Sequence, residues 1–149
     1  MNKRAKFVAV LFGPGIIALT LDQATKLFFP TRIFNQGVAF SLPFLSEQNM
    51  GQTVVIALLI VAISIFAAWH MRGNSALSMR FFYSILLGAA LSNWIDRVMY
   101  SGVRDIWYVP KLQMNNNVAD WLIVGSVIAI IAVDIRSHFQ QEVKHEPAE

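Results

Sequence analysis

Four long stretches of this 149-residue chain carry no formal charge, and they constrain its fold more than any other feature. They are residues 7–21, 48–71, 81–95 and 121–133. A helix that spans a bilayer needs about 20 mostly apolar residues. The second stretch is long enough alone, and the others reach this length when polar residues at one end lie inside the span. The sequence therefore predicts an all-α membrane protein with four transmembrane helices, near residues 7–28, 53–71, 80–99 and 117–136.

A soluble bundle of unusually apolar helices is the main alternative. Residues 54–69 are apolar around the whole helix rather than along one stripe, which is typical of a helix without a solvated face. Only 14% of the residues are charged, too few for a solvated shell when about 25% is usual. The first apolar run also follows basic residues, as in a secretory signal peptide. It has no small-residue cleavage site behind it and ends at Asp22, which indicates a retained helix.

Basic residues predict the orientation of this bundle. With four spans, one side holds seven lysines and arginines: Lys3, Arg4, Lys6, Arg72, Arg80, Arg136 and Lys144. The other side has only three in loops proper, so the positive-inside rule places both termini in the cytoplasm. These loop charges also account for the pI near 9.5, and no basic patch with interleaved aromatics indicates a nucleic-acid partner. We expect one integral membrane domain over residues 1–149, with a polar cytoplasmic tail at 137–149.

The topology gathers four aspartates at one depth. Asp22 and Asp96 lie near the outer ends of the first and third predicted helices. Asp105 lies in the outer loop, and Asp120 begins the fourth helix. Ionisable groups within membrane spans are costly and usually functional. The sequence therefore predicts a site at the outer interface.

Helical spacing refines this prediction. Ser92 and Asp96 are four residues apart and share one face of the third helix, and Gly88 continues that row with a small residue. Asn117 and Asp120 share a face of the fourth helix. Small residues allow close helix packing in membranes. The polar faces are therefore expected to turn toward each other and away from lipid, whereas the second helix supports the bundle from the lipid side.

The residue types at the outer face limit the chemistry. The chain has no cysteine, and its histidines (His70, His138 and His145) lie toward the cytoplasmic side. A thiol nucleophile, a serine–histidine pair and a zinc site are therefore excluded there. Two carboxylates that share a proton can activate water and polarise a carbonyl, as in aspartic peptidases. Ion pairs that only hold the bundle together, or that serve transport, remain equally open on physical grounds.

A series of short motifs resembles the lipoprotein signal peptidases (signal peptidase II). The resemblance covers residues 16–136 and rests on five motifs in the same order as in that family. The motifs are Asp22-Gln23-Ala24-Thr25-Lys26, Asn35-Gln36-Gly37-Val38-Ala39-Phe40-Ser41, Ser92-Asn93-Trp94-Ile95-Asp96-Arg97, Val103-Arg104-Asp105 and Asn117-Val118-Ala119-Asp120.

The resemblance implies a role for each motif. Asp105 and Asp120 match the catalytic pair of the family. Seven further residues match positions that support the site or contact the substrate: Asp22, Lys26, Asn35, Asn93, Asp96, Arg97 and Asn117.

The resemblance also implies the reaction. The family removes signal peptides from bacterial prolipoproteins, just before a cysteine that carries diacylglycerol, and is blocked by globomycin. It acts in the inner membrane near the outer leaflet and needs no metal or cofactor. A site completed within one chain makes a monomer the expected state.

Several positions depart from the family pattern. Residue 92 is Ser where Gly is usual, and residue 116 is Asn where an aromatic is usual. Arg104 places a charge beside Asp105, which is expected either to lower the pKa of that carboxyl or to face solvent. Only eight residues separate Lys26 from Asn35, so we expect a reduced outer β-type cradle, with a short strand and turn at residues 35–44. A relative with another substrate or without turnover, acting in binding or transport, therefore remains an alternative.

Overall fold

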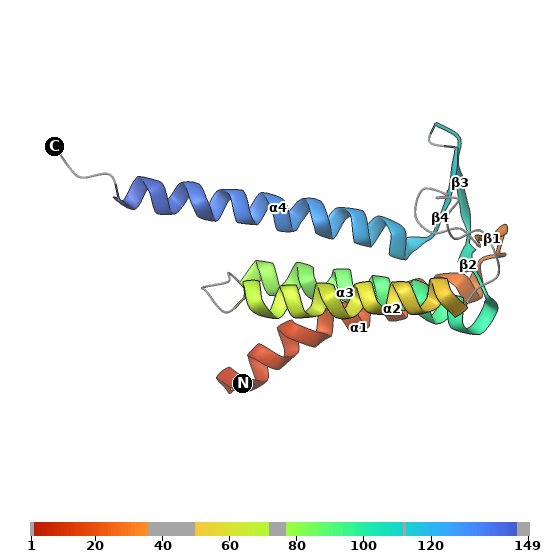
Figure 1. Cartoon of the computed structure of the whole chain (residues 1–149), viewed down its shortest axis with the longest axis horizontal. Coiled ribbons are helices and arrows are strands. Elements are labelled where there is room, and N and C mark those ends of the chain that lie inside the picture. Colours follow the sequence, from red (N-terminus) through yellow and green to blue (C-terminus); the bar gives the residue numbers. More distant parts are fainter. Residues whose placement is uncertain (1, 36–49, 72–76, 112, 146–149) are drawn as a thin grey trace.

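Four long helices run side by side, and short strands gather at one end of them (Figure 1). The structure is a computed structural model that describes residues 2–35, 50–71, 77–111 and 113–145. The helices are α1 (Lys3–Phe28), α2 (Met50–His70), α3 (Leu77–Tyr100) and α4 (Val118–His145). The start of α1 and the end of α4 lie at the end opposite the strands, as an even number of spans requires.

The four predicted segments are confirmed as helices. For three of them, both bounds agree with the predicted ranges to within a few residues. The exception is α4, which continues to His145 rather than ending near residue 136. Most of the expected polar tail is thus helical. Hydropathy marks only the part of a helix that suits lipid, whereas residues 137–145 are polar and form helix without an apolar signal.

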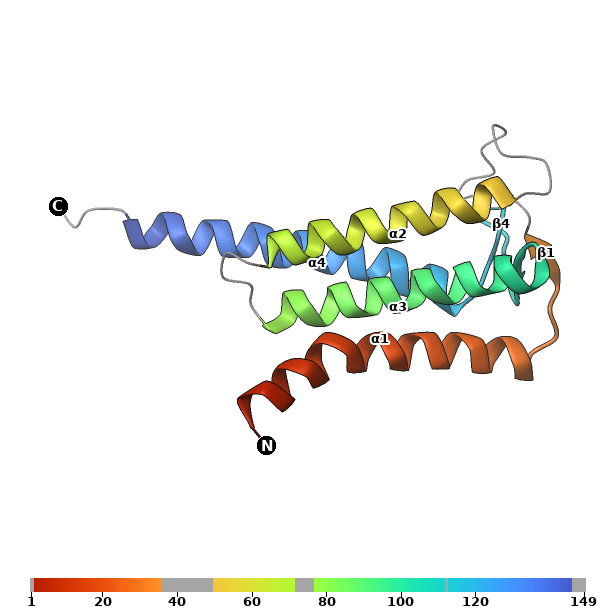
Figure 2. The same ribbon diagram turned by 60° about the horizontal axis from the view of Figure 1, so that its bottom comes forward.

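Within the described residues, three helical segments are long and apolar enough to cross a bilayer: Val8–Phe28, Thr53–His70 and Val118–Gln140. Along α2, large apolar side chains such as Leu58 and Ile65 are exposed, as expected for a helix that faces lipid. Helix α3 contacts each of the other helices and lies between α1 and α2 in Figure 2. Its position explains why α3 can carry more polar residues than its neighbours.

Small residues bring α1 and α3 into close contact. A Cβ atom on Gly88 would overlap the backbone of Gly15, and Ala89 is fully buried. The Gly15 N–H follows Pro14 within α1 and donates to Ser84 Oγ at 2.9 Å. The row of small residues predicted on α3 therefore forms its contact with α1.

Two small antiparallel sheets cover the end of the bundle that the sequence predicts to be the outer one, which we call the outer end, and the opposite end the inner end. In the first, β1 (Ile33–Asn35) pairs with β2 (Val103–Asp105). In the second, β3 (Trp107–Val109) pairs with β4 (Met114–Asn116). These strands are the reduced β-type cradle that the sequence predicted. The strand and turn expected at residues 35–44 lie outside the described residues beyond Asn35.

Candidate active site

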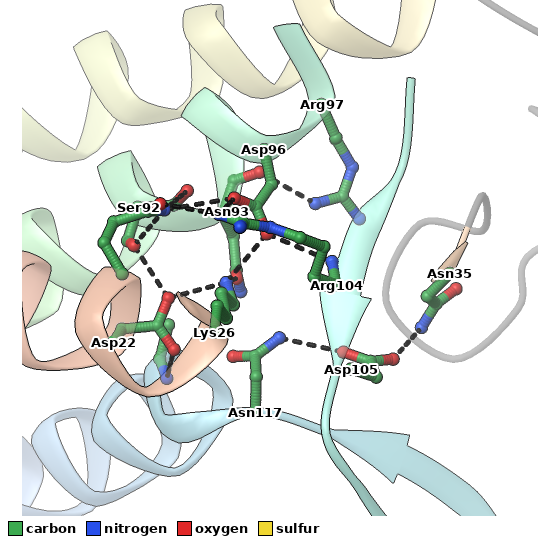
Figure 3. A network of polar contacts seen from close by, with 12 residues as sticks. Asp22, Lys26, Asn35, Ser92, Asn93, Asp96, Arg97, Arg104, Asp105 and Asn117 are labelled. Carbon is green, nitrogen blue, oxygen red and sulfur yellow. Dashed lines mark hydrogen bonds and ion pairs between the residues drawn. The ribbon is translucent and has the colours of Figure 1, made fainter. Parts of the chain in front are cut away.

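Polar side chains from three helices and two strands gather where the strands meet the helix ends (Figure 3). Asp22, Asp96 and Asp105 are completely shielded from solvent (0% exposed). Asp120, at the start of α4, reaches the same cluster through Asn93 and Asn117. All four aspartates that the sequence placed at one depth thus meet here. Buried charges are tolerated only with partners, so the contacts of each group define the site.

Lys26 is the central cation of this cluster. Its Nζ lies 2.6 Å from Asp22 Oδ2 and 3.1 Å from Asp96 Oδ2. It also donates to Asn93 Oδ1 at 2.9 Å. An ammonium has three N–H donors, and these three acceptors match them. Lys26 therefore ties the end of α1 to α3.

Asp22 joins α1 to the other two helices of the site. Its Oδ2 accepts a hydrogen bond from Ser92 Oγ at 2.7 Å. Its Oδ1 accepts the Ala119 N–H at 2.8 Å, in the first turn of α4. A carboxylate is favourable there because the first N–H groups of a helix lack partners within the helix. The hydroxyl of Ser92, where the family usually has Gly, is thus part of the network.

Arg104 points away from its neighbour Asp105. Its Nη2 donates to Asp96 Oδ1 at 2.8 Å and to Gln23 Oε1 at 2.7 Å. Its guanidinium lies over the Tyr100 ring, 4.5 Å from the ring centroid. Both expectations for Arg104 are therefore wrong, because a strand sends neighbouring side chains to opposite faces. Arg104 is buried against the helices and does not lower the pKa of Asp105.

Asp105 is held by two amides from different elements. Asn117 Nδ2 donates to its Oδ1 at 2.9 Å, and Asn35 Nδ2 donates to its Oδ2 at 3.1 Å. Burial raises the pKa of Asp105 above its ordinary value, and the two amide hydrogen bonds oppose this shift without cancelling it. Asp105 is thus a carboxyl that holds a proton more readily than an exposed one.

Asp120 and Asn117 form a reciprocal cap at the start of α4. The Asp120 N–H donates to Asn117 Oδ1, and the Asn117 N–H donates to Asp120 Oδ2, both at 3.1 Å. This is a capping-box arrangement, in which residues three apart satisfy each other's free backbone donors. Asn93 Nδ2 donates to the second oxygen of Asp120 at 2.8 Å. The start of α4 therefore fixes the position of this carboxylate.

Each of the two amides that hold the carboxylates is oriented by a hydrogen bond to its own oxygen. Asn93 accepts from Lys26 through its oxygen, so its N–H groups face Asp120. Asn117 accepts from the backbone of α4 through its oxygen, so its N–H groups face Asp105. Each carboxylate therefore receives N–H donors, which favour its charged form.

Arg97 brings a second cation close to the two carboxylates. Its Nη1 donates to the Asn93 carbonyl oxygen at 3.4 Å. Its guanidinium lies within electrostatic reach of Asp120, Asp105 and Asp96. In Figure 3 this side chain extends from α3 toward β2. A guanidinium there offers N–H donors to a substrate carbonyl or carboxylate.

All candidate residues predicted from the sequence lie in this cluster, but the predicted set omitted three of its members, Gln23, Ser92 and Arg104. Gln23 donates to Ser92 Oγ at 2.9 Å and to Asp96 Oδ1 at 3.1 Å, in addition to its contact with Arg104. The available signals were the place of Gln23 inside the first motif and the place of Ser92 on the polar face of the third predicted helix. For Arg104 the sequence offered no such signal, because a strand of three residues shows no clear alternation.

Titratable residues at the inner end lie apart from this site. His70 Nε2 is 3.2 Å from Asp134 Oδ1, and His138 Nε2 is 3.9 Å from Asp134 Oδ2. Within the parts of the chain that the structure describes, no group of three or more acidic, histidine or cysteine side chains could hold a metal ion. The outer cluster offers carboxylates, amides and cations.

Fold and site together define a multi-pass membrane protein in which the buried charged side chains of the described residues gather at one end. Its fold is similar to that of a bacterial membrane enzyme solved by the in meso method at 2.3 Å resolution. The TM-score is 0.65, with 20% identity over 91% of each chain. A second such enzyme, solved at 1.9 Å resolution, gives a TM-score of 0.62 with 22% identity, over 80% of this chain and 88% of the other. At this identity the likeness shows the fold alone.

Sequence comparisons show the family. Residues 15–136 match the family model described as "Signal peptidase (SPase) II". The chain is 31% identical to a lipoprotein signal peptidase of Methylorubrum extorquens, over 84% of this chain and 87% of the relative. It is 30% identical to one of Campylobacter jejuni subsp. doylei, over 91% and 93%. The chain belongs to the signal peptidase II family and is an enzyme of the aspartic-peptidase type.

Proposed function

We propose that this protein removes signal peptides from diacylglyceryl-modified prolipoproteins, with Asp105 and Asp120 as its catalytic pair. The observation that carries the proposal is Asn117, which contacts both carboxylates at once. One residue thereby fixes the spacing of two acids that come from β2 and α4. Relatives that carry the name lipoprotein signal peptidase support the choice of substrate.

The reaction follows from a pair of acids that shares one proton. Water attacks the carbonyl carbon of the scissile peptide, passing a proton to the ionised carboxylate, while the protonated carboxyl gives its proton to the carbonyl oxygen. The tetrahedral intermediate then loses its amine, which takes a proton from the first carboxyl. A hydroxyl proton returns to the second carboxylate. Because such pairs titrate as a unit, the roles of base and acid belong to the pair.

The remaining site residues serve the pair in different ways. Asp22, Lys26 and Asp96 hold α1 and α3 together beneath it. Asn93 orients Asp120, and Asn35 orients Asp105. We assign Arg97 to the substrate backbone, since its guanidinium interacts electrostatically with both acids. No metal or cofactor takes part in this scheme.

The proposed substrate fits the membrane setting. We place the protein in the bacterial inner membrane as a monomeric domain, with both termini in the cytoplasm and the site near the outer leaflet. The diacylglycerol of the substrate would remain in the lipid and hold its cysteine at the interface. The signal helix would lie beside the bundle, and the scissile bond would meet the carboxylates.

The deciding experiment is cleavage of a diacylglyceryl-modified prolipoprotein by the purified protein in detergent. Asp105→Asn and Asp120→Asn should each lower kcat by about 1,000-fold or more. Asp134→Asn is the matched control, since it makes the same change at the other end of the bundle. Equal cleavage by the wild type and both site variants would refute the proposal. Inhibition by globomycin gives a second test of the same site.

The short outer segment favours one alternative, a family member with a different or narrower substrate. Only eight residues separate Lys26 from Asn35, so little chain from this segment covers the substrate. A panel of lipid-modified prolipoproteins with different residues after the cysteine distinguishes the two possibilities. Cleavage of most of them supports a general enzyme, and cleavage of one or none supports the alternative.

A further inference from the structure

We propose that Arg104 is a positioning residue, which fixes β2 against the helices and β1 against β2 so that Asp105 and Asn35 meet. The kinetic test of this inference rests on the proposed function, whereas its structural test does not. The Arg104 side chain does not bond to either of the proposed catalytic carboxylates; it contacts Asp96, Gln23 and Tyr100 instead.

Asp96 holds both the backbone and the side chain of Arg104. Its Oδ2 accepts the Arg104 N–H at 3.0 Å, and its Oδ1 accepts Arg104 Nη2 at 2.8 Å. Two bonds from one carboxylate fix the position of this strand residue and its rotation about the strand axis. The next side chain, Asp105, must then point to the opposite face, where Asn117 receives it.

Arg104 also holds the neighbouring strand through aromatic rings. Its guanidinium lies over Tyr100, whose ring centroid is 6.4 Å from that of Phe34. Phe34 is the direct partner of Arg104 in the β1–β2 ladder. Contacts of this kind between cations and rings, and between rings, stabilise a fixed register. The register in turn sets the place of Asn35, whose amide donates to Asp105.

The charges of the helix ends explain why an arginine suits this place. Asp22 and Asp96 are both buried, and Lys26 supplies only one positive charge between them. Arg104 supplies the second charge from β2. Its planar guanidinium reaches Asp96 and Gln23 together while stacking on Tyr100, which a lysine cannot do.

The test compares Arg104→Met and Arg104→Lys with Lys111→Met in the full-length protein in detergent. Lys111 is exposed on the turn that follows β3, so its replacement makes the same charge change outside the network. Arg104→Met should lower kcat by about 10- to 100-fold, because a small displacement of a catalytic group has this effect. KM should stay within about threefold, since the residue does not contact substrate. Arg104→Lys should recover part of kcat.

Hydrogen exchange supplies a readout that does not depend on turnover. In Arg104→Met, peptides covering residues 31–35 and 103–106 should exchange about tenfold faster, while the helices keep their protection. The Arg32 N–H, which donates to the Asp105 carbonyl oxygen at 2.9 Å, reports this directly. Wild-type kcat in Arg104→Met overturns the proposal, and so does faster exchange spread evenly over all helices.

Two further measurements keep the proposal decidable. If Arg104→Met does not fold, Gln23→Leu and Arg104→Lys replace it. Each should lower kcat and speed hydrogen exchange in the same peptides, by smaller factors than those given for Arg104→Met. Adding Asn35→Ala to the Arg104 variant should lower kcat less than Asn35→Ala does alone, because both act through one contact. A wild type that cleaves nothing refutes the proposed function, whereas the exchange data still decide whether Arg104 anchors the strands.

Discussion

The two ends of this bundle are held together by different interactions. At the inner end, Ala67, Met79, Tyr83 and Leu86 form an apolar cluster, and the contacts of Asp134 with His70 and His138 are partly exposed. At the outer end, charged side chains are shielded from solvent and bonded to one another.

This difference shows how stability and chemistry are divided within one small protein. Apolar packing tolerates changes of shape and needs no fixed angle between groups. A buried charge network requires each partner at its distance, and it fixes side chains within a fraction of an ångström. The outer end thus combines a costly form of stabilisation with the positioning that a catalytic pair needs.

The largest expected effect comes from breaking the charge network with Lys26→Met. Asp22 and Asp96 would lose their shared partner, and an uncompensated buried charge costs about 3–5 kcal/mol. Equilibrium unfolding in mixed micelles measures this loss, with Lys111→Met as the matched control. A loss no greater than that of the control would mean that the outer end does not depend on its charges.

A smaller effect is expected where α1 and α3 pack through glycines. Gly88→Ala should lower the free energy of unfolding by about 1–3 kcal/mol, because its new methyl group overlaps the backbone of Gly15. Gly125→Ala is the control, since a Cβ there meets nothing within 4 Å. Equal stability of the two variants would contradict the close contact. The same unfolding assay compares them.

Asn35→Ala should change the pH profile of cleavage. Its amide hydrogen bond lowers the pKa of Asp105, so its removal raises that pKa further. The profile of kcat/KM should therefore move to higher pH, whereas Asn115→Ala should leave it in place. A move to lower pH would contradict this role.

The same pKa has a consequence for stability. A carboxyl whose pKa is higher in the folded state stabilises the fold below its unfolded pKa, and this contribution is lost as the pH rises through the folded pKa. In Asn35→Ala that loss should therefore be larger and extend to higher pH than in the wild type, because only the folded pKa has risen. Unfolding measured across the acidic range checks the sign.

The smallest effect is expected at the inner end. Asp134→Asn removes a partly exposed partner of His70 and should lower the free energy of unfolding by at most about 1 kcal/mol. Cleavage should be unchanged. A loss as large as that of Lys26→Met would erase the distinction between the two ends.

Much of the architecture could be predicted from the sequence because the membrane restricts the possibilities. Stretches without charge predicted the number of helices, and an even number of spans predicted that Asp22, Asp96 and Asp120 lie at one end, where the structure places them. The helical end of the chain was missed, since residues 137–145 form helix without an apolar signal. Hydropathy reports a lipid-facing surface rather than helix itself.

The site was predictable in its members but not in its connections. Periodicity placed Asn117 and Asp120 on one face, yet it could not show that their side chains and backbones cap each other. It also gave no direction for Arg104, because three residues of strand carry no clear alternation by themselves. Such details depend on which partner lies within reach after the elements have packed.

The bond from Ala119 to Asp22 has a further consequence, for the timing of assembly. The two residues are 97 positions apart, and α4 follows α1, α2 and α3 along the chain. The Asp22 carboxylate, with its counterion Lys26, can accept this hydrogen bond only after α4 has been made and inserted. Asp120 arrives with α4, so a nascent chain that ends before α4 cannot contain both Asp105 and Asp120. Under the proposed mechanism, hydrolytic activity therefore begins no earlier than the insertion of α4.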